Sequence, residues 1–428
     1  MRFNWWEMVG ISFIGALLVS NIAWAADLPS ALRQAVESDP RVLSARATYQ
    51  AKQVEAEGAY SVYLPIVRGT GSAGSSKSSD PLTRDGSKRV YGLELEQPIP
   101  LFGRESARVE LARVAVKIEA AEVNRVEQTV LAEVLEAILD TAARKEALAL
   151  RERLAVNLSE QSAAVRETIT GGGMKATEQR LILSRVAQSV ALRARAAAEL
   201  AAAEAKLQRM LPGIPPPLLD THLLRRWWTG TLSLEAVQET ALQAAPTLLK
   251  ARALAEQATA EHTVARTDLW PRLSLTMQGQ KGSFGAASAD SNSIFLGFSA
   301  PLYEGGSSLS RVDSAVHRSN AARENAAQEQ RMVTQRISEA WAHWRASEAM
   351  ALAWRESEQQ DEELIHLTEQ QLAGGAATQL VLLRAMQTWL ETVLQGVDYR
   401  SQRDVAWVRL LLESGVLTLA SLEHKQDK

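Results

Sequence analysis

The chain has 428 residues, and its 47 basic and 50 acidic side chains are interspersed, with a formal net charge of −3. This balance leaves no basic field of the kind that holds nucleic acid. Cysteine is absent, which excludes disulfides, thiolate metal sites, cysteine nucleophiles and a lipid anchor on an N-terminal cysteine. Aromatic residues make up only 5% of the chain. The interior is therefore expected to consist of contacts between neighbouring helices and not of one deep core.

Residues 1–26 have the pattern of a signal peptide. Arg2 lies near the start, an apolar run follows from Met8 to Val19, and residues 23–25, Ala-Trp-Ala, form a cleavage site. An uncleaved membrane anchor is the alternative, but the run is shorter than the ~20 apolar residues of a spanning helix. No later stretch reaches that length, so strands would make any membrane contact of the mature chain.

Two stretches of alternating residues predict four strands, at about 66–75, 89–97, 272–281 and 293–300. Pro65 and Pro100 bound the first stretch, and Pro271 and Pro301 bound the second, so these prolines are expected at strand–helix junctions. The predicted apolar face consists of Tyr91, Leu93, Leu95, Leu273, Leu275, Met277, Ile294, Leu296 and Phe298, with Glu94 and Glu96 on the other face.

This alternation has two interpretations. Strands with an apolar outer face and a polar inner face are typical of a β-barrel in lipid. Two half-buried hairpins of a water-soluble protein would show the same alternation of apolar and polar residues. Four strands cannot close a barrel, so a barrel would have to be shared between subunits.

Two stretches without Gly or Pro, 104–170 and 307–373, predict very long helices. Inside a helix proline costs about 3 kcal/mol and glycine about 1 kcal/mol, and each stretch would form a rod of roughly 100 Å. Glycines end both stretches, and helices at 174–211 and 376–414 are expected to run back. Two apolar stripes on the first rod, Val123, Val126, Val130, Val134 and Ile138 beside Leu131, Leu135 and Leu139, suit a helix between two neighbours. Trp341 and Trp344 are interpreted as core residues.

The same landmarks occur twice. Leu64-Pro65 recurs 206 positions later as Trp270-Pro271, and Pro100-Leu101-Phe102 recurs 201 positions later as Pro301-Leu302-Tyr303. We therefore expect two copies of one unit, 27–211 and 232–428, joined by a Pro- and Trp-containing linker at 212–231.

These landmarks carry a resemblance to a known family. The step from Leu64 to Pro65, the segment Gln97–Arg104 (QPIPLFGR), the segment Pro301–Gly306 (PLYEGG) and Gly375-x-x-Thr378, in this order and duplicated, resemble the outer-membrane efflux proteins of the TolC family. The segment 97–108 is similar to metal-efflux relatives, and 301–306 to partners of type I secretion systems.

The resemblance implies a mainly α, α+β fold. Long antiparallel helical hairpins would form a trimeric α-barrel in the periplasm, and each subunit would give four strands to one transmembrane β-barrel in outer-membrane lipid. It implies a passive channel that receives substrate from an inner-membrane pump, of the RND or ABC type, through a periplasmic adaptor (membrane fusion protein). No enzymatic activity, cofactor, metal or nucleic acid is implied.

The resemblance also implies site residues. The adaptor would dock at the hairpin tips, Gly171, Gly172, Gly173, Thr177, Gly374, Gly375 and Thr378, although a simple helix C-cap also explains the glycines. Val381 and Arg384 lie where some members close the tunnel with acidic residues. Three arginines at an aperture would repel cations; the alternative is a surface arginine paired to a neighbour.

The rival function is a periplasmic helical scaffold or adaptor without a pore. Motifs for other chemistry are weak. Residues 69–74 spell G-x-G-x-x-G, but inside a predicted strand and not at the strand-to-helix turn of a dinucleotide site. The six histidines are scattered without an i, i+4 pair, which argues against zinc.

Overall fold

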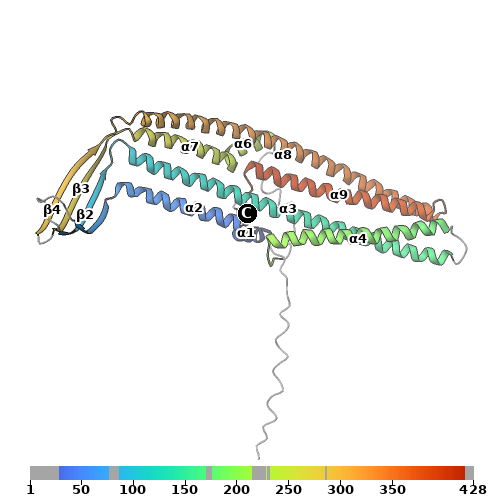
Figure 1. Ribbon diagram of the computed structural model, residues 1–428. Helices are drawn as coiled ribbons and strands as arrows, with labels where there is room; N and C mark the ends of the chain where they lie inside the picture. Colours follow the sequence, from blue (N-terminus) through green and yellow to red (C-terminus); the bar gives the residue numbers. More distant parts are fainter. Residues whose placement is uncertain are drawn as a thin grey trace, which may run out of the picture.

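The protein is a long rod of helices that ends in a four-stranded sheet (Figure 1). This computed structural model describes residues 28–76, 86–169, 176–214, 228, 232–284 and 287–419. The predicted signal peptide and most of the predicted linker lie outside these residues. Among the described helices, none combines the length and the apolar character needed to cross a membrane.

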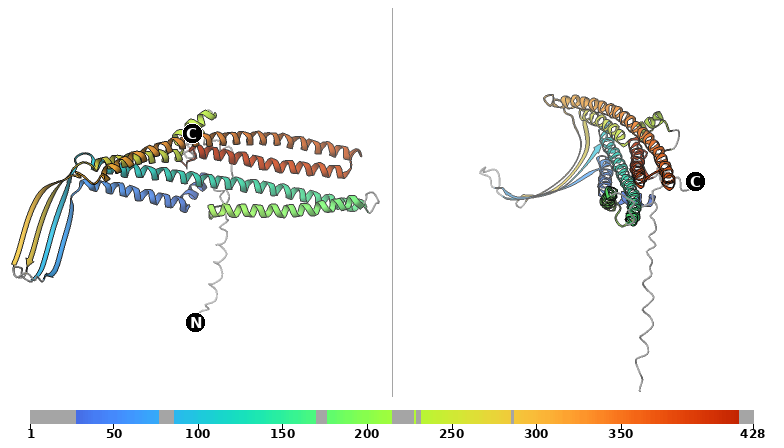
Figure 2. Two further views of the ribbon diagram at one scale, coloured as in Figure 1. Left: turned by 45° about the horizontal axis from the view of Figure 1, so that its top comes forward. Right: turned by 90° about the vertical axis from the view of Figure 1, so that its right-hand side faces the viewer.

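Two long helical hairpins form most of the rod. The first pairs α3 (Arg104–Ile169) with α4 (Ala176–Met210), and the second pairs α8 (Ser307–Ala373) with α9 (Gln379–Ser414). At the end of the rod opposite the sheet, α3 ends and α4 begins, beside the turn that joins α8 to α9 (Figure 2). The predicted antiparallel hairpins are therefore confirmed. The predicted start of the last helix at 376 is wrong, because Thr378 is extended at φ −100° and ψ 156° and α9 begins after it.

Shorter helices pack along the long hairpins, some at the middle of the rod and others between its middle and the sheet (Figure 1). These are α1 (Leu28–Ser38), α2 (Pro40–Gly58), the 3-10 helix η1 (Ala59–Tyr63), α6 (Leu234–Ala244) and α7 (Pro246–Thr267). Proline at the first position suits a helix start, since its missing N–H has no helical acceptor there. The carboxylate of Asp39 caps α2 by accepting from the Arg41 N–H at 2.8 Å.

The sheet has the order β1-β2-β3-β4 and is antiparallel throughout. Its strands are β1 (Ile66–Ser76), β2 (Gly86–Ile99), β3 (Arg272–Phe284) and β4 (Ala287–Ser299). They run further into the polar loops than predicted, because backbone pairing continues through Gly and Ser residues that break the apolar alternation. The register joins Leu95 to Met277 and Met277 to Ile294 in one row. This confirms the predicted apolar face.

The main core lies in the middle of the rod, where both hairpins meet α1 and α6. Both predicted stripes of α3 enter it, with Val130, Val134, Ile138, Leu131, Leu135 and Leu139 all buried. Trp344 is also buried there, and its ring lies 5.1 Å from Trp341 and 5.1 Å from Trp407, centroid to centroid. The interpretation of Trp341 and Trp344 as core residues is thus confirmed.

One glycine closes this core. Gly415 ends α9 with a φ of 76°, and a Cβ at this position would lie 2.5 Å from the carbonyl oxygen of Ala244. Only glycine fits this close approach.

Candidate functional site at the two ends of the rod

The turn of the second hairpin is a complete Schellman motif. Gly375 has a φ of 72°, its N–H donates to the Leu372 carbonyl at 3.1 Å, and the Ala376 N–H donates to the Gln371 carbonyl at 2.8 Å. These bonds satisfy carbonyls that the helix end leaves open. The C-cap interpretation of Gly375 is therefore confirmed, and a docking role would come in addition to it.

Thr378 follows the turn as the N-cap of α9. Threonine at this position normally accepts a hydrogen bond from the first turn, but here the side chain makes no such bond and the residue is exposed. Its hydroxyl is thus accessible at the tip. Of the first tip, Gly171, Gly172 and Gly173 lie outside the described residues, and Thr177 is described only as part of the α4 backbone.

The predicted aperture residues lie one helical turn apart on α9. Val381 is 50% exposed and Arg384 is exposed, whereas the intervening Leu382 and Leu383 are buried. Arg384 has no hydrogen bond or ion pair to any described residue. Both roles considered for Arg384, at an aperture or paired to a neighbour, therefore stay predictions.

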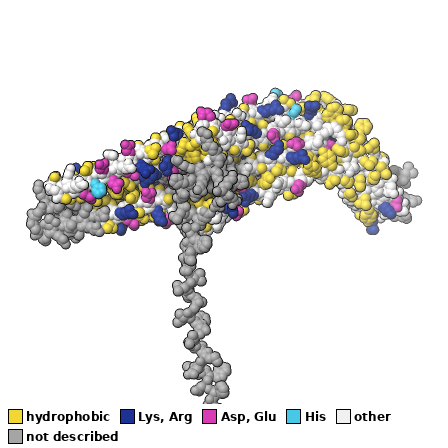
Figure 3. Space-filling model, turned by 180° about the vertical axis from the view of Figure 1, so that it is seen from behind, with side chains coloured by type: hydrophobic (Ala, Val, Ile, Leu, Met, Phe, Trp, Pro, Cys, Tyr) yellow, Lys and Arg dark blue, Asp and Glu magenta, His cyan; other side chains and the backbone are white. Residues whose placement is uncertain are grey.

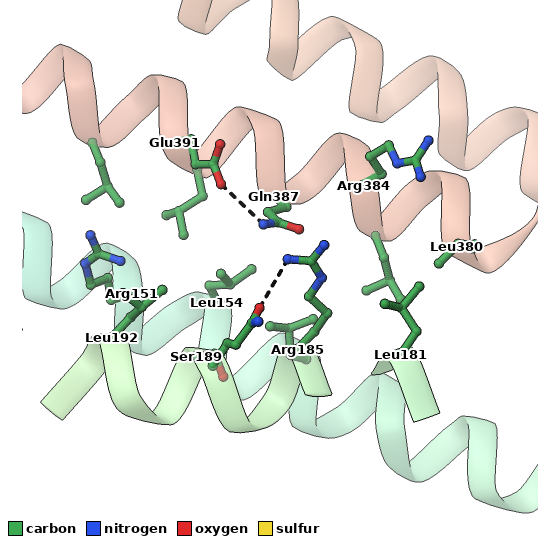
Figure 4. Close-up of a pocket in the computed structure, with 15 residues that line it drawn as sticks. Arg151, Leu154, Leu181, Arg185, Ser189, Leu192, Leu380, Arg384, Gln387 and Glu391 are labelled. Atoms are coloured by element: carbon green, nitrogen blue, oxygen red, sulfur yellow. Dashed lines mark hydrogen bonds between the residues drawn. The ribbon is translucent and has the colours of Figure 1, made fainter. Parts of the chain in front are cut away.

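A groove of about 310 Å³ lies between α9 and the first hairpin near the turns (Figure 4). Its floor is leucine-rich, and three arginines reach it against one carboxylate. Arg185 extends from α4 and donates to Gln188 at 3.1 Å. On the α9 side Gln387 donates to Glu391 at 3.2 Å. The lining side chains used below are Leu154, Leu181, Leu383, Arg151, Arg185 and Arg384.

Sequence reasoning missed this groove. Its walls come from segments far apart in the chain, so no local pattern marked Arg151 or Arg185. Further along the rod, the hairpins are linked by Arg400 on α9, which donates to Glu358 of α8 at 2.9 Å and to Glu146 of α3 at 3.0 Å.

The opposite end of the molecule exposes an apolar face on the sheet. Hydrophobic side chains gather over that end, whereas charged side chains of both signs are spread along the helices (Figure 3). The exposed apolar residues that share one sheet face are Val67, Tyr91, Leu93, Met277, Ile294, Leu296 and Phe298. On the other face Arg68 forms ion pairs with Glu96 at 3.0 Å and with Glu94 at 3.6 Å.

The four predicted junction prolines lie at the ends of the strands. Pro65 and Pro271 directly precede β1 and β3, Pro100 directly follows β2, and Pro301 follows β4 by two residues. Proline cannot donate to a ladder, so it suits the point where pairing stops.

A second cluster at this junction was not anticipated. The Phe102 ring stacks on Trp270 at 5.3 Å between centroids. Arg104 is buried, and its Nη2 lies 2.6 Å from Asp268 Oδ1 in an ion-pair contact that is not aligned as a hydrogen bond. Since these residues join the start of α3 to the end of α7, the cluster fixes the sheet against the rod.

Chemistry of other kinds finds no site in the described part of the chain. No three His, Asp or Glu side chains there lie close enough to hold a metal ion. The G-x-G-x-x-G segment lies within β1, away from any helix N-terminus.

Comparison with known proteins gives consistent matches. The family model of the outer membrane efflux protein matches residues 31–212 and 237–416. Outer membrane efflux protein BepC of Brucella suis is 25% identical over 415 residues, covering 95% of this chain and 89% of BepC. Alkaline protease secretion protein AprF of Pseudomonas aeruginosa is 26% identical over 429 residues, covering 95% and 88%.

A solved structure shows the same fold. The outer membrane protein VceC from Vibrio cholerae superposes with a TM-score of 0.76 at 17% identity, over 90% of this chain and 95% of that one.

Proposed function

Because this chain belongs to the outer membrane efflux protein family, we propose that it is the outer-membrane channel of a tripartite efflux or type I secretion system. Three copies would close one shared β-barrel from their sheets and one helical tunnel from their hairpins. Substrate would pass through it passively, with the driving energy supplied by an inner-membrane pump. Its relatives are transport proteins, and we propose no catalytic role.

The two-faced sheet at the end of a long helical rod carries this proposal. Its strands are 11 to 14 residues long, so each reaches the ~9–11 residues that a tilted spanning strand needs. The exposed apolar face suits lipid, whereas the face with Arg68, Glu94 and Glu96 suits a water-filled interior. A helical scaffold without a membrane role does not account for a sheet with one exposed apolar face.

At the other end, we propose that the turn and the groove receive a periplasmic adaptor. Glycine and an exposed hydroxyl at Gly375 and Thr378 let a partner helix approach closely and hydrogen-bond. The leucine floor of the groove, together with Arg151 and Arg185, suits an amphipathic helix with an acidic edge. Whether the pump is of the RND or the ABC class depends on whether this adaptor serves an efflux system or a type I secretion system.

Two cargo classes are candidates. BepC is named as an efflux protein and AprF as a protease secretion protein. Expression of this chain in cells that lack their own channel, paired in turn with an efflux pump and with a type I secretion pump, distinguishes them by which export returns.

The channel itself is tested by planar-bilayer recording of the detergent-purified full chain. We expect discrete pores that disappear when the protein is heat-denatured. The rival scaffold without a pore predicts no conductance, and it also predicts that carbonate washes the protein from membranes. Retention after carbonate together with discrete pores supports the proposal, and release without pores overturns it.

A further inference from the structure

The far end of the sheet, where β1 ends and β2 begins, lies away from the rod (Figure 1). There the strand register places Arg89 of β2, Lys281 of β3 and Asp290 of β4 on the same face as the apolar side chains. All three side chains are exposed. In the described strands this face carries no other charged side chain. Its charges are therefore confined to the far end.

The two cations of this group are neighbours. Tyr91 pairs with Lys281, and Arg89 pairs with Ser283, so Arg89 and Lys281 are diagonal neighbours on adjacent strands. Diagonal neighbours on one sheet face lie about 7–8 Å apart, which long side chains can bridge. Both cations can therefore reach the same anionic group.

Asp290 does not neutralise these two cations. Its Oδ2 lies 3.8 Å from Lys281 Nζ, and the side chains of Lys281 and Asp290 are 81% and 63% exposed. An ion pair this long and this exposed contributes little. Among the described residues, the guanidinium of Arg89 has no hydrogen-bond or ion-pair partner. On the described strands, each copy thus keeps a net positive charge at the far end of this face.

The position of Arg89 along β2 corresponds to the far surface of a membrane. Arg89 precedes Ile99, the last residue of β2, by ten positions, a length of about 33 Å at ~3.3 Å per residue. In strands tilted by ~35–45°, this length spans about 23–27 Å, and the apolar band of a membrane barrel is about 25 Å tall. The near end carries Phe102 and Trp270, 52% and 50% exposed, and aromatic rings favour the membrane surface. With these rings at one surface, Arg89 reaches the other.

We propose that Arg89 and Lys281 bind the phosphate group of an anionic lipid in the outer leaflet. A guanidinium can donate two parallel hydrogen bonds to a phosphate, and the flexible lysine side chain can bring its charge to the same group. The apolar face next to them favours a lipid over a soluble anion, because acyl chains and phosphate then occupy adjoining parts of one surface. This inference rests on the membrane barrel proposed above and adds the chemistry of its lipid partner.

Binding is measured on the detergent-purified full chain by native mass spectrometry, with lipid A, a lipid that carries two phosphates, added to the micelles. We expect the protein to retain lipid A, and to retain phosphatidylethanolamine, which has no net charge, much less. Inorganic phosphate at the same concentration should not displace lipid A. Equal retention of the two lipids, or full displacement by inorganic phosphate, overturns the proposal.

Charge variants test the two cations directly. Arg89→Gln and Lys281→Gln should each weaken lipid A binding about fivefold, the effect of one cation near a lipid surface, and Asp290→Asn should strengthen it. Lys88→Gln is the matched control, because Lys88 adjoins Arg89 in β2 but lies on the opposite face. An equal loss in Lys88→Gln and Arg89→Gln, or weaker binding in Asp290→Asn, overturns the site.

The same samples separate the lipid site from the channel. Planar-bilayer recording shows that each variant still forms a pore and is therefore folded. A wild-type chain that conducts and resists carbonate but retains no lipid A overturns the lipid site and leaves the channel intact. A chain that retains no lipid A, forms no pore and is released by carbonate overturns both.

Discussion

At the residue scale, the buried charge of Arg104 is the most costly feature of the junction. The residue is only 6% exposed, and among the described residues its Nε and Nη1 have no hydrogen-bond partner. Its one short contact is with Asp268. A buried charge that loses its partner is strongly destabilising, whereas removal of both charges is often nearly neutral.

We therefore predict that Asp268→Asn lowers the free energy of unfolding by about 3 kcal/mol, and that Arg104→Met in the same chain recovers most of this loss. Urea unfolding in detergent, followed by circular dichroism, measures both. Arg108→Met is the matched control, since Arg108 lies 3.9 Å from the same carboxylate but is exposed. A double variant no more stable than Asp268→Asn alone would contradict this account.

Glu122 is a second residue whose charge matters. It accepts from Arg125 at 2.6 Å and from Lys250 of α7 at 3.0 Å. The Arg125 hydrogen bonds, followed by the Lys250 bond, lower the pKa of Glu122 from 4.5 to about 2. The pair with Lys250 thus links α3 to α7 only while this carboxylate is ionised.

Because the folded pKa is the lower one, the stability that Glu122 contributes is complete above its unfolded value of 4.5 and is lost as the pH falls to about 2. We predict that Glu122→Gln removes this part of the acid dependence and costs about 1 kcal/mol at neutral pH, since the pairs are partly exposed. Thermal melts across this pH range measure it. Glu110→Gln, at an exposed pair 3.7 Å long, should change little; an equal effect there would refute the assignment.

At the element scale, the turn between α8 and α9 separates a structural role from a functional one. Gly375 must adopt a left-handed conformation, while its added Cβ would meet nothing within 4 Å. The backbone conformation at Gly375 therefore restricts which residues are tolerated, whereas the space around its Cα would admit a side chain. The open space at the tip is what a docking partner would occupy.

We predict that Gly375→Trp abolishes export while trimer formation and membrane insertion are retained, because the bulk blocks the adaptor. Gly375→Asn, which tolerates the left-handed conformation, controls for bulk, and Gly375→Ala controls for backbone strain. Both should keep export. Normal export by the Trp variant, or loss of export in all three, would remove the docking role of the tip.

The elements also show what a sequence can and cannot predict. The long helices could be predicted because the exclusion of Gly and Pro is local, and α8 covers the same residues as the predicted segment. The strand faces followed from alternation. The start of α9 could not be placed, since Thr378 is a cap and not a helical residue. The Arg104–Asp268 pair and the groove beside Arg185 depend on segments that meet only in the folded chain.

At the scale of the whole molecule, Arg384 is exposed on α9, near the turn between α8 and α9. If three copies surround one axis, three such guanidinium groups would converge and disfavour cations. Within the described part of the chain, no ion pair compensates this charge.

We predict that Arg384→Asp shifts the ion preference of the pore toward cations, measured as a change of reversal potential under a salt gradient. Arg185→Asp, on the groove side of α4, is the matched control and should leave the preference unchanged. A shift in the control and not in Arg384→Asp would place the lumen on the other side of this helix layer.

The central pairing of the sheet has a consequence for how the protein folds. β2 and β3 pair residues that are 174 to 196 positions apart, from Ile99 with Leu273 to Lys88 with Phe284, whereas each helical hairpin closes locally. Contacts between distant segments form slowly, because the intervening chain must first be ordered. We therefore expect the helices to fold early in water and the sheet to form last, so that its apolar face appears only when lipid and neighbouring copies are there to cover it.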